Sequence, residues 1–481
     1  MKEKFYITTA IDYVNSVPHL GHALEKVQAD AIAHYQRILN KEVYFLTGVD
    51  EHGIKIVRSS QDAGKKVEDF VNENSAKFAE LTKKLNISND DFIRTSDRER
   101  HWSGAQSLWK KLVEAGDIYK GKYSGSYCVG CEAYVTEKDL IDGKCPYHFK
   151  EPEKIEEENY FFKLSRYVDE IKNKIESGEL KILPESRKNE ILAMFKEGVG
   201  DISFSRPKEK LSDWGVPVPN DESQLMYVWC DALANYISAL GYGSKNEDNF
   251  KKFWPADLHI IGKDILRFHA LIWPAMLISA KLPLPKTIFV HGFILSNGKR
   301  MSKTLGNVID PFYLAEKYGV DAVRYYLLRE ITPFEDGDIT EEKFKEAYNA
   351  NLANGLGNLT ARIMKMSEQY LKSEELRVEN KNFTPYKNEV FYSGLMDNFE
   401  LNKVMDLIWQ KISELDLYIQ KTEPFKLIKT DEKKAKEILV ELISGLRDIA
   451  LMLRPFLPQT SEKILESIKL NKMPEALFPR V

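Results

Sequence analysis

Phe5-Tyr6-Ile7-Thr8-Thr9-Ala10-Ile11 is the first apolar run of the chain, and Pro18-His19-Leu20-Gly21-His22 follows it after a short loop. β-Branched and aromatic residues dominate the first run, which is typical of a buried strand. Apolar residues then recur at helical spacing, at Leu20, Leu24, Val27, Ala31, Tyr35 and Ile38. Another apolar run, residues 43–47, supplies the next strand. This βαβ unit predicts a doubly wound parallel sheet.

The two histidines stand at the predicted turn from strand to helix. Backbone N–H groups are free at a helix start and the helix dipole favours an anion there, so His19 and His22 are candidates for binding phosphate. Gly21 would let a flat ligand approach the backbone closely, because it has no side chain. The alternative is that the two histidines simply cap a turn of the fold.

Composition places the chain among globular proteins of more than one domain. It has 481 residues, of which 43% are hydrophobic and 30% charged, so two to four domains are expected. No apolar run approaches the roughly 20 residues that span a bilayer. The first residues lead directly into the first strand, which leaves no room for a signal peptide, so we expect a cytoplasmic protein with no membrane partner. The net charge of −4 neither supports nor excludes binding of nucleic acid.

The pattern of predicted strands and helices changes three times along the chain. Residues 1 to about 115 alternate strands and helices, whereas residues 116 to about 220 contain short strands broken by glycines, which predicts an insertion that interrupts the sheet. The α/β pattern resumes after residue 220. Beyond about residue 340 long helical periodicities predict a helical bundle, with apolar stripes at Leu401, Val404, Leu407, Ile408, Ile412 and Leu415 and at Ile438, Leu439, Leu442, Leu446 and Ile449.

Three of the four cysteines lie in the insertion and predict a metal site. Cys128 and Cys131 form one CxxC pair, and Cys145 and His148 form a CxxH pair after 13 intervening residues. Four sulfur and nitrogen ligands make a closed tetrahedral zinc site with a structural role. The alternative is a set of free buried thiols. The remaining cysteine, Cys230, is expected to be buried packing.

A second candidate phosphate site is the basic loop of residues 298–307. It contains Lys299, Arg300 and Lys303 with small hydroxyl residues and glycines around them, which suits a mobile loop over a polyphosphate. A solvated surface loop is the alternative. Two distant loops that both suit one triphosphate favour the phosphate-binding interpretation.

These motifs resemble those of a known family. His19-Leu20-Gly21-His22 resembles the HIGH motif, and Arg300-Met301-Ser302-Lys303-Thr304 the KMSKS motif, of class I aminoacyl-tRNA synthetases. Their order and separation are most similar to those of methionyl-tRNA synthetases, from about residue 4 to the C-terminus. The first lysine of the motif is Arg300 here and its final serine is Thr304.

The resemblance implies a Rossmann-type α/β fold split by a zinc-knuckle connective insertion, then an all-α anticodon-binding bundle. The implied division is residues 1–115 for the first half of the catalytic domain and 116–220 for the connective peptide. Residues 221–325 would form the second half, 326–350 a stem-contact segment, and 351–481 the anticodon-binding domain.

The resemblance also implies a two-step reaction with ATP and Mg²⁺. Methionine would be activated to an adenylate with release of pyrophosphate and then transferred to tRNA(Met), both initiator and elongator. His19, His22 and Lys303 would be catalytic, and Gly21, Asp264, Arg300, Ser302 and Thr304 would bind ATP. No nucleophile of the protein is needed, only alignment and stabilisation of charge.

The methionine site follows from the same resemblance and suits the residue types present. Methionine is long and polarizable, so an aromatic-lined slot fits it. The implied residues are Ala10, Ile11, Tyr13, Asp50, Trp229, Ala232, Leu233, Tyr236, Ile265 and His269. Asp50 would pair with the α-ammonium group, and Leu233 stands where many relatives have proline. Without the resemblance, the favoured interpretation of Trp229 and Tyr236 would be that they are core residues.

Polar residues spaced four apart in the C-terminal region predict RNA contacts. Asn354, Asn358 and Arg362 could contact the edges of unstacked anticodon bases. Phe425 follows a proline as the stacking tryptophan of the family does, but it lacks the indole donor. An ordinary solvated helix face is the alternative.

Other functions fit these motifs less well. Synthetases for leucine, isoleucine or valine usually carry a large editing insertion, for which the roughly 100-residue insertion here leaves no room. A cysteine-specific relative would use zinc to bind substrate, whereas these four ligands would close the site. A catalytically idle zinc and RNA-binding module, or a small-molecule nucleotidyltransferase, would not need all of these motifs together. We expect a monomer, because no appended oligonucleotide-binding domain follows the bundle.

Overall fold

The computed structural model describes residues 2–135, 137–146, 149–301, 307–372 and 390–481. Contacts divide the chain into two compact units. The sheet unit comprises Met1–Pro18, Lys41–Thr82 and Asn89–His291, and the helical unit comprises His19–Asn40, Lys83–Ser88 and Gly292–Val481.

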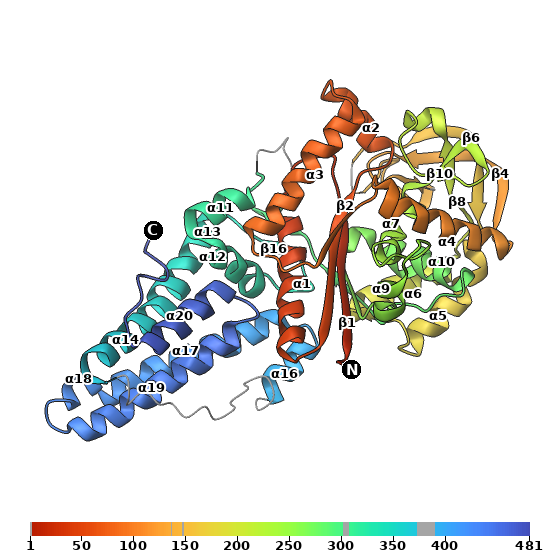
Figure 1. The fold of residues 1–481 in the computed structure, drawn as a ribbon. Coiled ribbons are helices and arrows are strands. Elements are labelled where there is room, and N and C mark those ends of the chain that lie inside the picture. The colour runs from red at the N-terminus through yellow and green to blue at the C-terminus, as the bar shows by residue number, and fades with distance from the viewer. Residues whose placement is uncertain (1, 136, 147–148, 302–306, 373–389) are drawn as a thin grey trace. The chain divides into compact units, whose positions relative to one another are not determined.

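A six-stranded parallel sheet forms the centre of the sheet unit (Figure 1). Its strand order is β3-β2-β1-β12-β13-β7, and every pairing is parallel. The strands are β1 (Lys4–Tyr13), β2 (Glu42–Asp50), β3 (Asp91–Arg94), β12 (Leu258–Gly262), β13 (Thr287–His291) and β7 (Lys181–Leu183). Strand order reverses between β1 and β12, and ligands bind at the carboxyl ends of strands beside such a point. The predicted Rossmann-type parallel sheet is confirmed.

The segment predicted as an insertion, residues 116–220, contributes one strand of the central sheet and all but one strand of two small antiparallel sheets, the last of which begins just after residue 220. The larger has the order β5-β4-β6-β8 and the smaller β10-β11-β9. Their strands are β4 (Ile118–Cys128), β5 (Ala133–Val135), β6 (Glu153–Phe162), β8 (Ile202–Ser203), β9 (Ser205–Pro207), β10 (Pro217–Val218) and β11 (Asp221–Met226). Strand β7 also lies within this segment, yet it pairs with β13. The segment therefore extends the central sheet as well as interrupting it.

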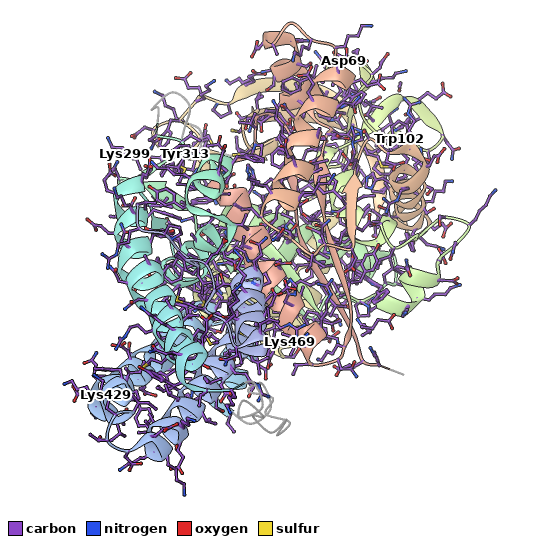
Figure 2. All side chains as sticks on the ribbon, turned by 60° about the vertical axis from the view of Figure 1, so that its left-hand side comes forward. Asp69, Trp102, Lys299, Tyr313, Lys429 and Lys469 are labelled. Atoms are coloured by element: carbon purple, nitrogen blue, oxygen red, sulfur yellow. The ribbon has the colours of Figure 1, made fainter. Side chains whose placement is uncertain are left out.

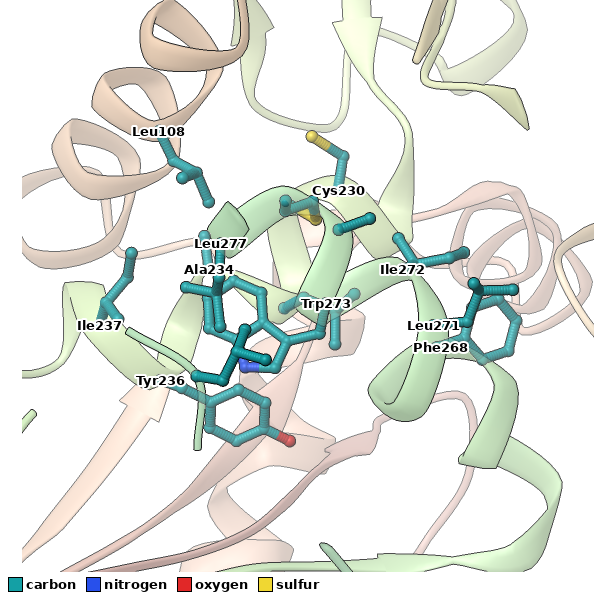
Figure 3. Close-up of a cluster of buried hydrophobic side chains, with 14 of the residues drawn as sticks. Leu108, Cys230, Ala234, Tyr236, Ile237, Phe268, Leu271, Ile272, Trp273 and Leu277 are labelled. Atoms are coloured by element: carbon teal, nitrogen blue, oxygen red, sulfur yellow. The ribbon is translucent and has the colours of Figure 1, made fainter. Parts of the chain in front are cut away.

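Helices of the sheet unit bury one large apolar cluster against the sheet. Trp273 lies at the heart of this cluster, fully buried, with its ring centroid 6.0 Å from that of Tyr236 and 5.9 Å from that of Trp254 (Figure 3). The helices of this unit are α2 (Ile54–Asp62), α3 (Val67–Lys84), α4 (Ser103–Glu114), α5 (Val168–Glu176), α6 (Glu185–Glu197), α7 (Val228–Leu233), α8 (Asn235–Ser238), α9 (Asp248–Phe253) and α10 (Trp273–Ser279). Only the last two residues of α3 belong to the helical unit.

The helical unit is built around long antiparallel helices that lie side by side (Figure 1). Its helices are α1 (Leu20–Ile38), α11 (Pro311–Tyr318), α12 (Val320–Tyr325), α13 (Glu341–Ala347), α14 (Asn358–Tyr370), α16 (Val390–Asp397), α17 (Leu401–Thr422), α18 (Pro424–Leu427), α19 (Glu432–Leu453) and α20 (Pro458–Leu470). A small sheet, β14 (Ile294–Ser296), β15 (Lys299–Arg300) and β16 (Gly337–Asp338), completes it.

The predicted apolar stripes form the interior of this bundle. On α17 four of the six stripe residues are buried, with Leu407 and Leu415 partly so, and all five on α19 are buried. Charged side chains such as Lys429 and Lys469 lie on the surface instead (Figure 2). The C-terminal region is thus helical, as predicted. Among the described residues, no helix is both long and apolar enough to cross a membrane.

Helix α1 belongs to the helical unit, although it directly follows β1 in the chain. Most of its residues are buried, including the charged residues Lys26 and Asp30. Asp30 lies 2.7 Å from the fully buried guanidinium of Arg324 on α12. This grouping depends on a contact between residues distant in sequence, which has no local signature and was therefore not predicted. The predicted five-part division into domains stays a prediction.

Candidate active site

A hydrogen-bonded pair of aromatic residues lies beside the carboxyl end of β12. The Tyr236 hydroxyl and Nε2 of His269 are 2.8 Å apart, and Nδ1 of His269 is 3.1 Å from the carbonyl oxygen of Ile265. A carbonyl only accepts, so Nδ1 carries the proton and Nε2 accepts the hydroxyl proton of Tyr236. Burial lowers the pKa of His269 to about 4. The imidazole is therefore neutral near pH 7, and this wall of the site carries no charge.

Trp229 forms a second aromatic wall. Its indole stacks on Phe268 with ring centroids 3.6 Å apart and an angle of 7° between the planes. It also meets His269 edge-on at 6.5 Å. One face of a half-buried indole is thus fixed by Phe268, a residue that the sequence analysis did not select. Rigid aromatic surfaces of this kind make favourable contacts with a polarizable thioether.

Asp50 ends β2 and is 5% exposed. Its Oδ1 accepts hydrogen bonds from the His52 amide at 3.2 Å and from the Thr95 hydroxyl at 3.4 Å. Burial, together with the nearby charge of Asp231, raises the pKa of this carboxyl well above its ordinary value. A ligand cation beside Asp50 would supply the missing opposite charge, which suits an α-ammonium group.

A second buried carboxylate, Asp231, lies between two histidines. Its Oδ2 is 2.9 Å from Nδ1 of His52, and its Oδ1 is 3.4 Å from Nε2 of His101. Burial alone would raise the pKa of Asp231, but these two histidines outweigh it and lower the pKa. His101 is held in turn by Ser238, with 2.8 Å between Nδ1 and the hydroxyl oxygen. Asp231, His52 and His101 were not predicted as site residues, although Asp231 stands two residues after Trp229.

The other predicted methionine-site residues also lie in the sheet unit. Ala232 and Leu233 are buried on α7, Ala10 is 9% exposed, and Ile11 is partly buried on β1. One apolar cluster joins most of the predicted set: Ala10, Ile11, Tyr13, Trp229, Leu233, Tyr236 and Ile265. Tyr13 ends β1 and its hydroxyl donates to Oε1 of Glu132 at 2.7 Å.

The histidine turn starts α1 in the helical unit. His19 is the N-cap, and its Nδ1 accepts from the Gly21 amide at 3.1 Å, while Nδ1 of His22 accepts from the His19 amide at 3.1 Å. The two rings stack with centroids 3.9 Å apart. These backbone N–H groups are therefore not free for an anion, contrary to expectation, because the imidazoles themselves take them. The two histidines thus cap the start of α1.

The caps also fix the tautomer of each ring. With Nδ1 accepting in both, the neutral imidazoles carry their protons on Nε2. Burial and the charge of Lys26 lower the pKa of His19 to about 4, so this ring is neutral. A Cβ at Gly21 would lie 2.9 Å from Cε1 of His19, so glycine makes room for that ring. Each Nε2–H can donate to a phosphate oxygen.

The second predicted phosphate loop is described in part. Arg300 is exposed on β15, with its guanidinium 4.1 Å from the ring centroid of Phe293 and its carbonyl accepting from Asn307 at 3.1 Å. Ser302, Lys303 and Thr304 lie outside the described residues. Asp264 is exposed in the turn that follows β12, in the sheet unit. A Cβ at Gly262 would lie 2.8 Å from Oδ1 of Asp264.

Three of the four predicted metal ligands come together. The sulfur atoms of Cys128, Cys131 and Cys145 all lie within 4.8 Å of one another, and those of Cys131 and Cys145 are 3.4 Å apart. Burial and the neighbouring thiols raise the pKa of Cys131, as expected where several thiolates would repel one another without a cation. The three thiols fit a zinc ion, with His148 outside the described residues. Cys230 is buried in the apolar cluster, as predicted.

The predicted RNA-contacting residues lie on the helical unit. Asn354 and Asn358 are exposed on successive turns, and Arg362 on α14 pairs with Asp416 on α17. Phe425 at the start of α18 is 42% exposed. Both α14 and α18 pack on α19. Arg362 and Phe425 therefore lie on two helices that both pack on α19.

Known proteins match this chain over almost its whole length. The sequence profile of a family described as "tRNA synthetases class I (M)" matches residues 5–154 and 138–364. A Methionine--tRNA ligase of Thermotoga maritima is 43% identical over 98% of this chain and 76% of its own length. One of Brucella suis is 43% identical over 97% of this chain and 92% of its own. The chain belongs to the methionyl-tRNA synthetase family.

A solved member of the methionyl-tRNA synthetase family has the same fold. The Mycobacterium tuberculosis methionyl-tRNA synthetase in complex with methionyl-adenylate superposes with a TM-score of 0.90 and 36% identity. The match covers 99% of this chain and 98% of that one. The resemblance drawn from the HIGH-like and KMSKS-like motifs is therefore confirmed.

In this member of the methionyl-tRNA synthetase family, the residues that were not predicted are those that hold the proposed substrate-contacting side chains in place. Phe268 lies next to His269, and Glu132 directly after Cys131, so both were adjacent to selected positions. His52 stands two residues after the predicted Asp50, and Asp231 stands between the predicted Trp229 and Ala232. Their hydrogen-bond partners are distant in sequence, which is why no local spacing identified them.

Proposed function

We propose that this chain is an ATP-dependent methionine–tRNA ligase. It activates methionine to methionyl-adenylate with release of pyrophosphate and then transfers methionine to the 3′ end of tRNA(Met), initiator and elongator alike. The observation that carries the proposal is the near-full-length match to proteins named Methionine--tRNA ligase. The neutral aromatic walls beside a buried carboxylate support it.

Methionine binds in the sheet unit in this proposal. The side chain lies against Trp229, which Phe268 holds from behind, and against the uncharged pair of Tyr236 and His269. A charged imidazole there would favour a polar ligand, whereas a neutral one accepts a thioether. The α-ammonium group pairs with Asp50. Ala10, Ile11, Tyr13, Ala232, Leu233 and Ile265 complete the proposed pocket.

ATP is held through its phosphates and ribose. Nε2–H groups of His19 and His22 donate to phosphate oxygens, and Asp264 binds the ribose. The methionine carboxylate attacks the α-phosphorus, the bond to the β-phosphate breaks, and pyrophosphate leaves. Negative charge builds on the phosphate oxygens, so preorganised donors lower the barrier. Gly21, Arg300, Ser302, Lys303 and Thr304 contribute by resemblance, and Mg²⁺ on ATP supplies further positive charge.

The tRNA contacts come from the helical unit. Asn354, Asn358 and Arg362 contact unstacked anticodon bases, and Phe425 offers an exposed ring for stacking. Residues 326–350 form the proposed stem-contact segment. Zn²⁺ held by Cys128, Cys131, Cys145 and His148 has a structural role. A monomeric state and a cytoplasmic location stay predictions from the sequence.

Exchange of labelled pyrophosphate into ATP tests the activation step. We expect exchange that depends on methionine and is at least about tenfold faster with methionine than with leucine or cysteine at equal concentration, because the pocket suits a thioether. Trp229→Ala should raise the KM for methionine, and Tyr370→Ala on α14, an aromatic residue outside the proposed pocket set, is the matched control. Faster exchange with leucine or cysteine would contradict the proposal.

A further inference from the structure

Glu132 connects the cysteine-bearing turn to the interior of the sheet unit. It follows Cys131 directly and has a left-handed backbone, with φ of 50°. Only 4% of it is exposed, although Val129, Gly130 and Cys131 just before it are partly exposed. A glutamate placed in this way is held by specific partners, because a buried carboxylate without them is costly.

The partners of Glu132 come from three separate segments. Its Oε1 accepts hydrogen bonds from the Tyr13 hydroxyl, at 2.7 Å, and from the Lys55 amide. Its backbone carbonyl accepts from the Tyr227 hydroxyl. Each segment also carries a proposed methionine-site residue: Tyr13 itself, Asp50 five residues before Lys55, and Trp229 two residues after Tyr227.

Close packing around the carboxylate makes this junction rigid. A Cβ at Gly53 would lie 2.2 Å from Oε2 of Glu132 and 2.5 Å from the Tyr13 hydroxyl oxygen, so only glycine fits there. Gly53 also has φ of 101°, which other residues rarely adopt. The Lys55 ammonium lies 5.4 Å from the centre of the Tyr13 ring and donates to the Gly130 carbonyl at 3.5 Å. The metal turn thus contacts the pocket segments at several points.

We propose that Glu132 is a positioning residue that couples metal binding by the three cysteines to the affinity for methionine. Glu132 does not touch the substrate. It holds Tyr13 and the start of α2 in place, and the metal holds the turn that presents Glu132. The inference rests on the proposed methionine site, and it adds a role in substrate affinity to a zinc site that would otherwise be purely structural.

Three variants and a chelated sample test this coupling. Glu132→Ala removes the acceptor, Glu132→Gln keeps an oxygen at the same place, and Glu137→Ala is a matched control on an exposed glutamate of the same segment. For each we would measure zinc per chain, KM for methionine and for ATP in pyrophosphate exchange, and the Kd for methionine from tryptophan fluorescence without ATP.

Glu132→Ala is expected to raise the KM and Kd for methionine about tenfold, because two partly buried donors, the Tyr13 hydroxyl and the Lys55 amide, lose their acceptor. Its zinc content and KM for ATP should stay within about twofold of wild type, and Glu132→Gln should recover most of the affinity. Removing zinc from the wild-type protein with a chelator should raise the Kd for methionine by a similar factor.

Two results would overturn the coupling. One is an unchanged methionine Kd in Glu132→Ala with zinc retained, and the other is an unchanged Kd in the zinc-free wild type. If Glu132→Ala does not fold, the chelated wild type decides alone. Wild-type protein that neither binds methionine nor supports methionine-dependent exchange would instead refute the proposed function.

Discussion

Replacing Asp30 by alanine is expected to destabilise the helical unit by about 3–5 kcal/mol, because it leaves a buried arginine without its counter-charge. Asp30 and Arg324 are both fully buried, and Nη2 of Arg324 lies 2.7 Å from Oδ2 of Asp30. The other acceptors of Arg324 are neutral carbonyls, those of Phe456 at 2.7 Å, Leu85 at 3.3 Å and Pro455 at 3.4 Å. They solvate the guanidinium but do not neutralise it.

The loss at Asp30 extends beyond the ion pair. Its Oδ1 also accepts from the amide and the hydroxyl of Ser88, at 2.7 and 2.6 Å. Two further donors would therefore be left without their acceptor, which costs about 1–3 kcal/mol for each buried group that finds no water. Since α1 begins at His19, a displaced α1 would also disturb the histidine turn.

A double-mutant cycle measures this effect. Thermal melts of wild type, Asp30→Ala, Arg324→Met and the double variant should show the double variant less destabilised than the sum of the single ones, since the charge no longer lacks a partner. For Asp30→Ala we expect the melting temperature to fall by roughly 6–20 °C. The control is Lys426→Ala, which removes an exposed pair with Glu423 and should cost less than about 1 kcal/mol. A melting temperature within about 2 °C of wild type for Asp30→Ala would refute the reasoning.

Three further changes probe the proposed chemistry. His22→Ala should slow methionine-dependent exchange by about 10²–10³ with a KM for methionine within about twofold, because it removes a donor to the phosphates; a normal rate would exclude that role. Burial lowers the pKa of His269 from 6.5 to about 4, so below pH 6.5 the unfolded chain binds a proton that the folded chain excludes. Melts should therefore show stability falling as the pH drops from 6.5 towards 4, by about 1 kcal/mol from this residue at pH 5.5, and His269→Gln should show a smaller dependence. Arg362→Ala should slow tRNA charging about tenfold and leave exchange unchanged, since it removes a base contact; Asp416→Ala, which removes only the pairing partner of Arg362, is the control, and equal losses in charging and exchange would remove the anticodon role.

Local patterns predicted the elements that are defined by local chemistry. The strand at residues 5–11, the helix that starts after His19 and the stripes of α17 and α19 follow from periodicity alone, because burial of one face imposes that spacing. The cysteine spacing likewise predicted the trio that the structure brings within 4.8 Å. In each case the residues that meet are close in sequence or share one repeating pattern.

Residues whose roles depend on distant partners were not predicted. β7 is only three residues long, Lys181–Leu183, and nothing in its sequence indicates that it pairs with β13. The sequence around Arg324 does not indicate that this arginine is buried, because its partners Asp30 and the Phe456 carbonyl are distant in the chain. Glu132 gains its three contacts from segments about 80 to 120 residues away. Long-range packing of this kind leaves no mark on local spacing.

Charging of tRNA is the most direct measurement of the central claim. Purified protein would be incubated with ATP, Mg²⁺, tRNA(Met) and labelled methionine, leucine or cysteine in parallel, and label on the 3′ end of the tRNA would be counted. The account predicts ATP-dependent labelling with methionine and only background with the other two. Labelling with leucine or cysteine above that with methionine, or none with methionine while exchange proceeds, would contradict it.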